Sequence, residues 1–295
     1  MLYLILFFIF LFGLTIGSFL NCLIWRLRKG EGMLNRSYCP KCKKQIVWYD
    51  NLPILSFVLL RGRCRYCKQK ISWQYPAVEL ITAVLFLISF IVNLQPLIIN
   101  TFPNFQFSIR QLADNFQLIS NFQFLNFSLL TSHFSLLILR DWFLIAVMII
   151  IFVYDLRWYL ILDKVVLPAC FAVFIFNLLL GFSSQGGFPN WHNLLISGII
   201  GSSFFLFQFI ISKGKWIGGG DIRLGLLMGL ALGWPNVMLA IFLAYLIGSV
   251  VGVGLIISGK KQWGSQVPLG VFLSTATVIT LFWGQQILNW YFGLF

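Results

Sequence analysis

The sequence predicts an all-α polytopic membrane protein of about eight transmembrane helices, with a small cytosolic module between the first two. Three observations predict this class. Of the 295 residues, 59% are hydrophobic and only 10% are charged, against about 25% charged residues in an average soluble domain. Several apolar runs approach or exceed the roughly 20 residues that cross a bilayer. The basic residues are also unevenly spread, because twelve of the 21 Lys and Arg lie within residues 26–70.

The net charge of +13 is compatible with either a nucleic-acid partner or an anionic membrane surface. Its distribution favours the membrane. Lys and Arg concentrated beside spanning segments mark the cytoplasmic side, and a basic stretch there is attracted to anionic headgroups. We therefore expect membrane lipid as a partner and no nucleic acid.

Residues 1–25 form the first predicted transmembrane helix. The N-terminus has no basic n-region, and no small-residue cleavage site follows the apolar run, so residues 2–24 are expected to be a retained span. Gly17, Ser18 and Asn21 lie inside it. Small and polar residues in a span serve helix packing or interhelical hydrogen bonds, although lining a substrate site is an alternative.

Residues 26–75 form a polar module with two Cys-x-x-Cys pairs, Cys39 with Cys42 and Cys64 with Cys67. This spacing is typical of a four-thiolate zinc site. Disulfides are the alternative, but they rarely persist in the reducing cytosol where the basic flank places the module. Four thiolates leave no open position on zinc, so the predicted role is structural. Cys22 and Cys170, within apolar segments, are expected to pack in the core.

Residues 76–136 are predicted to contain a second span, 76–94, and an extracytoplasmic loop. Glu79 lies near the start of the span, where its charge either complements the helix macrodipole or faces a substrate. Residues 95–135 are rich in Phe, Asn, Gln and Ser and nearly free of charge. We interpret them as a loop at the membrane interface, with His133 as a loop histidine.

Residues 137–295 are predicted to form a six-helix membrane domain. The expected spans are 137–154, 165–181, 191–211, a short 222–234, 237–257 and 268–295. Alternating sides through all eight spans satisfies the positive-inside rule at every cytoplasmic connection and leaves only Arg110 and Arg140 as basic residues outside. Asp155 and Asp221 then emerge at the same, cytoplasmic face.

These two aspartates are the candidate catalytic pair. An acid at the edge of a hydrocarbon layer is costly and therefore a functional-site candidate. Two close carboxylates can share one proton, so that one activates water while the other supports the substrate carbonyl oxygen. Gly218 and Gly220 precede Asp221 and allow close backbone approach. The alternatives are helix-boundary aspartates without chemistry, or a transporter or proton relay using Asp155 and Asp221. Acids near one interface and no visible inverted repeat weigh against a transporter.

The sequence resembles the type IV prepilin peptidases (prepilin leader peptidase/N-methyltransferases, of the Gly-x-Gly-Asp class of membrane aspartic proteases) over nearly the whole chain. The stretches that carry the resemblance are Gly17–Asn21, Arg36–Cys42, Trp48–Pro53, Arg61–Cys67, Asp155 with Asp163, and Gly218–Asp221. It implies a bacterial cytoplasmic-membrane aspartic endopeptidase that removes the basic leader of type IV prepilins or pseudopilins, with Asp155 and Asp221 as catalytic residues.

The resemblance further implies that the 26–75 module is linked to S-adenosylmethionine-dependent methylation of the new N-terminus. No glycine-rich loop for this donor is visible, so its ligands stay unassigned. Two motifs depart from the family pattern. Ile161-Leu162-Asp163 stands where Ile-Pro-Asp is usual, and Pro268-Leu269-Gly270-Val271 replaces a Pro-Phe-Gly-Pro-type motif. Neither departure removes a proposed catalytic or zinc residue.

Overall fold

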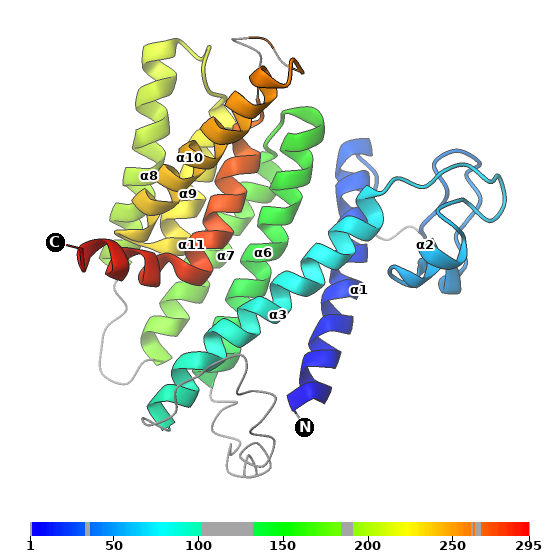
Figure 1. Ribbon diagram of the computed structural model, residues 1–295, viewed down its shortest axis with the longest axis horizontal. Coiled ribbons are helices and arrows are strands. Elements are labelled where there is room, and N and C mark those ends of the chain that lie inside the picture. Colours follow the sequence, from blue (N-terminus) through cyan, green and yellow to red (C-terminus); the bar gives the residue numbers. More distant parts are fainter. Residues whose placement is uncertain are drawn as a thin grey trace. The chain divides into compact units, whose positions relative to one another are not determined.

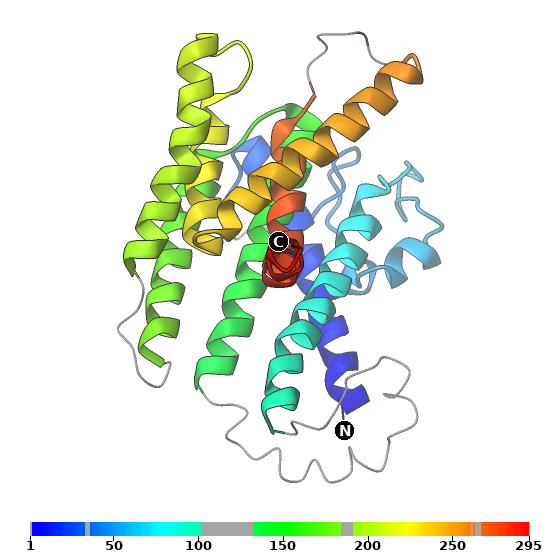
Figure 2. The ribbon, with the colours of Figure 1, turned by 60° about the vertical axis from the view of Figure 1, so that its left-hand side comes forward.

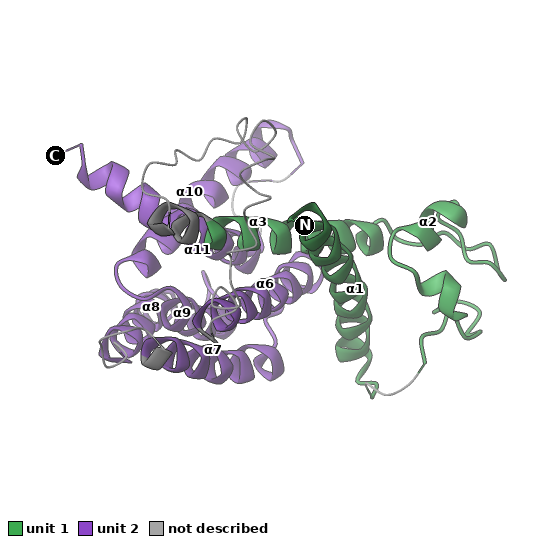
Figure 3. Cartoon of the chain, turned by 90° about the horizontal axis from the view of Figure 1, so that it is seen from below, with its two compact units in different colours: residues 1–130 green, residues 131–295 purple. Residues whose placement is uncertain are grey.

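The computed structural model describes residues 2–32, 36–101, 132–183, 191–260, 262 and 267–294. The chain divides into two compact units, unit 1 with residues 1–130 and unit 2 with residues 131–295 (Figure 3). The described part is helical, apart from turns and two isolated β-bridges. The predicted all-α membrane class is therefore confirmed.

The described residues of unit 1 form two long helices, with a small module between them in the sequence (Figure 1). The elements described there are α1 (Leu2–Lys29), the 3₁₀ helix η1 (Trp48–Asn51), α2 (Leu55–Leu59) and α3 (Gln74–Thr101). Unit 2 is a bundle of six helices. They are α6 (Ser132–Trp158), α7 (Asp163–Ser183), α8 (Trp191–Ser212), α9 (Gly219–Leu232), α10 (Asn236–Ile257) and α11 (Leu269–Phe292).

Seven of the described helices are long and apolar enough to cross a membrane, namely α1, α3, α6, α7, α8, α10 and α11. The short span expected at 222–234 corresponds to α9, which has 14 residues. At 1.5 Å per residue it is about 21 Å long, shorter than the roughly 30 Å hydrocarbon layer. α9 therefore belongs to the bundle without crossing a bilayer by itself.

Two boundaries of the expected 95–135 loop differ from the prediction. α3 continues to Thr101, because Leu97, Ile98 and Ile99 prolong the apolar run beyond Pro96. α6 begins at Ser132, so His133 belongs to a helix and not to a loop. The remainder of the predicted loop, residues 102–131, lies outside the described residues.

The two long helices of unit 1 pack closely through small residues. A Cβ added to Gly13 would lie 2.5 Å from the Cα of Ala83, and one on Gly17 would lie 2.6 Å from the Cα of Glu79. Backbones this close exclude any side chain at the glycine positions. Asn21 adds a polar link, since its Nδ2 donates to the Gly17 and Tyr75 carbonyl oxygens at 3.3 and 3.0 Å. These contacts support the packing interpretation of Gly17 and Asn21.

Unit 2 is held together at its centre by a similar glycine contact between α8 and α9, which run side by side in both views (Figures 1 and 2). Gly201 of α8 and Gly225 of α9 each lie directly against the other's carbonyl group, and Gly229 lies against the carbonyl of Ser197. The core around them is apolar and includes the fully buried Leu224 and Met228. The short helix is thus wedged against α8 by backbone-to-backbone packing.

Two asparagines bond to the C-terminal end of α9 and the turn that follows it. Asn177 of α7 donates from Nδ2 to the Leu230 carbonyl oxygen at 2.8 Å. Asn193 of α8 accepts from the Trp234 backbone N–H at 2.8 Å and donates to the Trp234 carbonyl at 3.3 Å. The last carbonyls of a helix have no intrahelical partner. These side chains therefore stabilise a helix end that would be costly in an apolar environment.

A glycine substitution tests the α8–α9 contact. Gly225→Val should lower the stability of the detergent-solubilised protein by about 1–3 kcal/mol, as overpacking a close contact does. Thermal melting measures the change. Gly252→Val is the control, because a Cβ at this α10 position meets nothing within 4 Å. Equal losses in both variants would show that helix propensity, and not the contact, is responsible.

Candidate active site and metal centre

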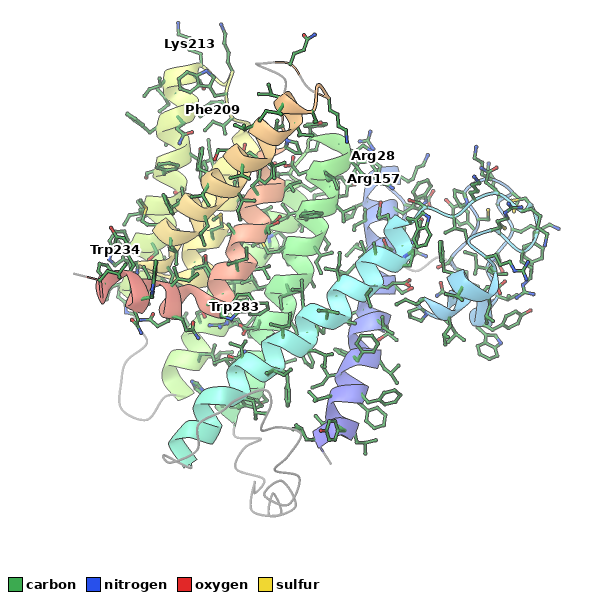
Figure 4. All side chains as sticks on the ribbon, in the orientation of Figure 1. Arg28, Arg157, Phe209, Lys213, Trp234 and Trp283 are labelled. Atoms are coloured by element: carbon green, nitrogen blue, oxygen red, sulfur yellow. The ribbon has the colours of Figure 1, made fainter. Side chains whose placement is uncertain are left out.

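Both predicted catalytic aspartates lie at the same end of unit 2. Asp155 is in the last turn of α6, and Asp221 is in the first turn of α9, just after the segment that leaves the end of α8. Arg157 marks the C-terminal end of α6 and Lys213 follows the C-terminal end of α8. Figure 4 shows both residues on one side of unit 2, with Trp234 and Trp283 farther from that side. The C-terminal ends of α6 and α8 and the N-terminal end of α9 therefore lie at the end of unit 2 that holds the two carboxylates.

Asp155 is 5% exposed and bonds to the start of α11. Its Oδ2 accepts the backbone N–H of Val271 at 3.1 Å. The C-terminal end of α6 is a poor place for an anion, because the macrodipole there is negative. The N-terminal end of α11 offers the opposite field and unpaired N–H groups. The contact with α11 therefore gives the Asp155 carboxylate a backbone donor.

Asp221 lies outside the seven spanning helices and is 7% exposed. Its Oδ2 accepts the Gly218 backbone N–H at 3.0 Å, which closes the first turn of α9. Burial raises the pKa of the Asp221 carboxyl above its usual value, the Gly218 N–H opposes this shift, and the negative charge of Asp155 adds to it. Asp221 therefore retains its proton at a higher pH than an exposed aspartate does.

Ile161 lies against two glycines, one next to Asp221 in the chain and one against the Asp155 carboxylate. A Cβ on Gly220 would lie 2.7 Å from the Ile161 Cβ, so only glycine fits there. A Cβ on Gly270 would lie 3.1 Å from the Ile161 Cδ1 and 2.8 Å from the Asp155 Oδ2. The two glycines allow α9 and α11 to close on the same side chain. The surroundings of Asp155 and Asp221 therefore meet at Ile161.

An exposed ion pair lies beside this site. Arg223 of α9 donates to the carboxylate of Asp163 at the start of α7. Exposed pairs contribute only about 0–1 kcal/mol, so this one orients the first turns of the two helices more than it stabilises them. The carboxylate of this ion pair is Asp163, the last residue of the Ile161-Leu162-Asp163 motif.

The four predicted metal ligands come together in unit 1. The sulfur atoms of Cys39, Cys42, Cys64 and Cys67 all lie within 4.8 Å of one another, and they form a group that could hold a metal ion. The Sγ atoms of Cys39 and Cys67 are 3.9 Å apart. A tetrahedral site with Zn–S distances of about 2.3 Å needs sulfur separations of roughly 3.8 Å. The geometry therefore fits a tetrahedral metal.

The two Cys-x-x-Cys turns are copies of one knuckle. In the first, the Cys39 N–H donates to the Lys44 carbonyl, and the Lys43 N–H donates back to the Cys39 carbonyl. In the second, Cys64, Lys68 and Gln69 repeat both bonds. Lys43 and Lys68 have positive φ values of 56° and 57°. Such a turn directs both sulfurs to one side, and two facing knuckles complete the cluster.

Two family models match this chain. Residues 11–93 match the model of the bacterial peptidase A24 N-terminal domain, and residues 142–253 match that of the type IV leader peptidase family. A prepilin leader peptidase/N-methyltransferase from Aeromonas hydrophila is 31% identical, with 96% of this chain and 92% of the relative aligned. Proteins of the same name from Legionella pneumophila and Bacillus subtilis are 28% and 25% identical, each aligned over 96% of this chain and over 93% and 96% of their own lengths. No solved structure matched.

The chain belongs to the type IV leader peptidase family. The expected resemblance is confirmed, and the transporter or proton-relay alternative is not favoured. Asp155 and Asp221 both lie inside the segment 142–253, which matches the type IV leader peptidase model. The four cysteines lie inside the N-terminal match, 11–93.

Some residues around the aspartates were not singled out from the sequence as parts of the site. Val271 supplies a backbone N–H, and Gly270 and Ile161 shape the space between the helices. The Pro-Leu-Gly-Val motif was visible only as a departure from a family pattern. A backbone donor leaves no signature in side-chain chemistry, so its partner could not be deduced.

Glu79 makes a contact that the sequence did not indicate. α3 begins at Gln74, so Glu79 lies beyond the first turn, where the macrodipole effect is strongest. Its Oε2 accepts the backbone N–H of Ile54 at 2.8 Å, and the residue is 6% exposed. Glu79 therefore attaches the module to α3.

The metal cluster can be tested with one cysteine substitution. Cys64→Ser should release bound metal and leave residues 36–73 open to proteolysis, because three thiolates bind less tightly and no longer join the knuckles. Metal analysis of the purified protein measures the loss. Cys22→Ser, outside the cluster, should keep the parent's metal content, and retention of metal by Cys64→Ser would disprove the four-thiolate site.

Proposed function

We propose that this chain is a prepilin leader peptidase that uses Asp155 and Asp221 as its catalytic pair and that also methylates the new N-terminus. The observation that carries the first part is that Gly220, next to the buried Asp221, and Gly270, against the buried Asp155 carboxylate, both lie against Ile161. Relatives named prepilin leader peptidase/N-methyltransferase, aligned over most of their length, supply the reaction class and the substrate. Type IV prepilins or pseudopilins are the proposed substrates.

In the proposed mechanism the two carboxyl groups share one proton. Asp155, with its charge supported by the α11 N–H group, is ionised and takes a proton from water as the water oxygen attacks the scissile carbonyl carbon. Asp221, protonated, donates a hydrogen bond to the carbonyl oxygen as negative charge develops on it. The tetrahedral intermediate then collapses, the C–N bond breaks, and the amine leaves with the proton that Asp155 had taken.

The second proposed reaction transfers a methyl group from S-adenosylmethionine to the amine that cleavage exposes. The sulfonium–methyl bond breaks, the nitrogen–methyl bond forms and the amine loses a proton. We assign no residue to the methyl donor. For the cysteine cluster we propose zinc, which prefers four thiolates in structural sites. It would join the two knuckles and stabilise a module too small for a large apolar core.

We also propose that the protein lies in the bacterial inner membrane with the catalytic pair and the zinc module on the cytoplasmic side. In unit 2, basic residues cluster at the end that holds the aspartates, namely Arg157, Lys164, Lys213, Lys215 and Lys260. The positive-inside rule assigns such an end to the cytoplasm. A prepilin whose basic leader remains in the cytosol would reach the pair from that side.

Replacing either aspartate tests the catalytic assignment. Asp155→Asn and Asp221→Asn should each reduce leader removal by at least about 10²–10⁴-fold, the usual contribution of a positioned acid or base. Mass spectrometry of a panel of prepilins in lipid measures cleavage. Both variants should still methylate a pre-cleaved pilin, and Glu31→Gln, which removes a carboxylate of unit 1, should cleave normally. Full activity in either Asn variant would refute the pair.

A smaller change tests the geometry around Asp155. Gly270→Ala places a Cβ about 2.8 Å from the Asp155 Oδ2, so the carboxylate must move. Because small misplacements of reacting groups are costly, leader cleavage should fall by roughly 10²-fold. Alanine is a better helix former than glycine, so a weaker α11 would not explain the loss. Gly254→Ala, in open space on α10, should retain activity, and equal activity of the two variants would contradict the prediction.

A further inference from the structure

A groove in unit 1 has no role in the proposed peptidase chemistry. It lies between α2 and the first turns of α3 and has a volume of about 820 Å³. We call it the α2 groove. Its lining residues come from α2, the second knuckle and the start of α3, and they include Phe57, Arg61, Arg63, Lys70, Trp73 and Leu80.

The α2 groove is positively charged. Arg61, Arg63 and Lys70 line it, all three are exposed, and no Asp or Glu is among the lining residues. Arg63 and Lys70 lie opposite each other on an isolated antiparallel bridge. Within the described part of the chain, none of the three forms an ion pair with a carboxylate. Three clustered cations of this kind are complementary to an anion.

The basic pair on the bridge is specific to the second knuckle. The first knuckle repeats the same backbone, but its bridge joins Tyr38 to Gln45 at the positions that Arg63 and Lys70 occupy in the second. The fold of the knuckle therefore does not require basic residues there. Their presence in one copy only indicates that the groove, and not the metal cluster, uses them.

Around the cations the α2 groove is apolar and exposed. Phe57 and Trp73 form an aromatic pair with ring centroids 5.0 Å apart. Trp73 is 76% exposed, and on α2 itself Val58 and Leu59 are 64% and 78% exposed. A five-residue helix that shows such side chains to water is unfavourable, since burying them in an apolar medium would stabilise it by roughly 25 cal/mol per Å².

The groove lies beside the first turns of a helix that is long and apolar enough to span a membrane. The spanning segment of α3 begins at Gln74, and Pro76, Ala77 and Leu80 from its first turns form one wall. The Ile54 N–H bond to Glu79 holds the start of α2 against the same turns. Aromatic residues and Lys or Arg at the end of a span are typical of the headgroup layer.

We propose that the α2 groove binds the phosphate headgroup of an anionic phospholipid. Arg61, Arg63 and Lys70 contact the phosphate, while α2 and Trp73 lie among the upper acyl chains. S-adenosylmethionine fits the groove less well, because its sulfonium and amino groups exceed its one carboxylate in charge and no acidic side chain faces them. The bound lipid holds the module against the membrane.

Lipid retention by the full-length protein tests the proposal without relying on activity. The protein in detergent receives equal amounts of phosphatidylglycerol and phosphatidylcholine, and native mass spectrometry counts the lipids retained. The parent should prefer phosphatidylglycerol. A triple variant, Arg61→Gln with Arg63→Gln and Lys70→Gln, should lose on the order of 100-fold of that preference, because each of the three cations near the headgroup layer contributes about 1 kcal/mol.

The matched control replaces Lys41, Lys43 and Lys44 of the first knuckle by Gln. It removes the same charge from exposed positions that do not line the groove, and it should keep the parent's preference. Equal losses in the two triple variants would mean diffuse attraction and would overturn the proposal. Displacement of phosphatidylglycerol by added S-adenosylmethionine would also overturn the proposal.

Unchanged metal content confirms that the module of each variant is folded. If the first triple variant loses metal, the three single variants decide, and an unchanged preference in all of them overturns the proposal.

Discussion

The hydrogen bond from the Val271 backbone N–H to the Asp155 carboxylate is the interaction on which the membrane site depends. It joins the C-terminal end of α6, which repels an anion, to the N-terminal end of α11, which attracts one. An acid in an apolar bundle without such a donor would be protonated or displaced toward water. The bond forms only because Gly270 leaves room for the carboxylate. The missing side chain at Gly270 therefore allows both the close packing of α11 and its bond to Asp155.

The short length of α9 is related to the position of Asp221 in its first turn. Asp221 must start a helix beside Asp155, yet a full-length span beginning there would need about 20 residues. α9 ends after 14 residues. Backbone carbonyls that end inside a membrane domain cannot bond to water and need protein partners. Asn177 and Asn193 supply bonds to this region from α7 and α8, so the polar side chains of neighbouring helices make a short internal helix stable.

Unit 1 applies a different principle, in which one small motif is used twice. The two knuckles share their backbone bonds, their positive-φ lysines and their paired cysteines. A metal bound by four thiolates would hold them together where few apolar residues are available. With the backbone held by the metal, the outer side chains of each copy are free to differ. The second copy carries Arg63 and Lys70, and the proposed lipid site arises from that difference.

Much of this protein is determined by local sequence. The spans follow from apolar run length, and the metal cluster follows from the spacing of two Cys-x-x-Cys pairs, because both depend on residues close together in the chain. The shared face of Asp155 and Asp221 was predicted from charge alone, and the structure places them at one end of unit 2. The contact of Glu79 could not be predicted, because its partner is a backbone N–H 25 residues away.

Only the tertiary structure decided what lies between the aspartates. Ile161, Gly220 and Gly270 come from three separate segments, and their contact depends on the angles and depths at which α9 and α11 meet α6. The same is true of the length of α9, because its end is stabilised by side chains from other helices and not by its own sequence. Periodicity and spacing report which side chains a segment offers. They do not report which backbone groups of distant segments will meet them, because hydrogen bonds to the backbone leave no mark on residue type.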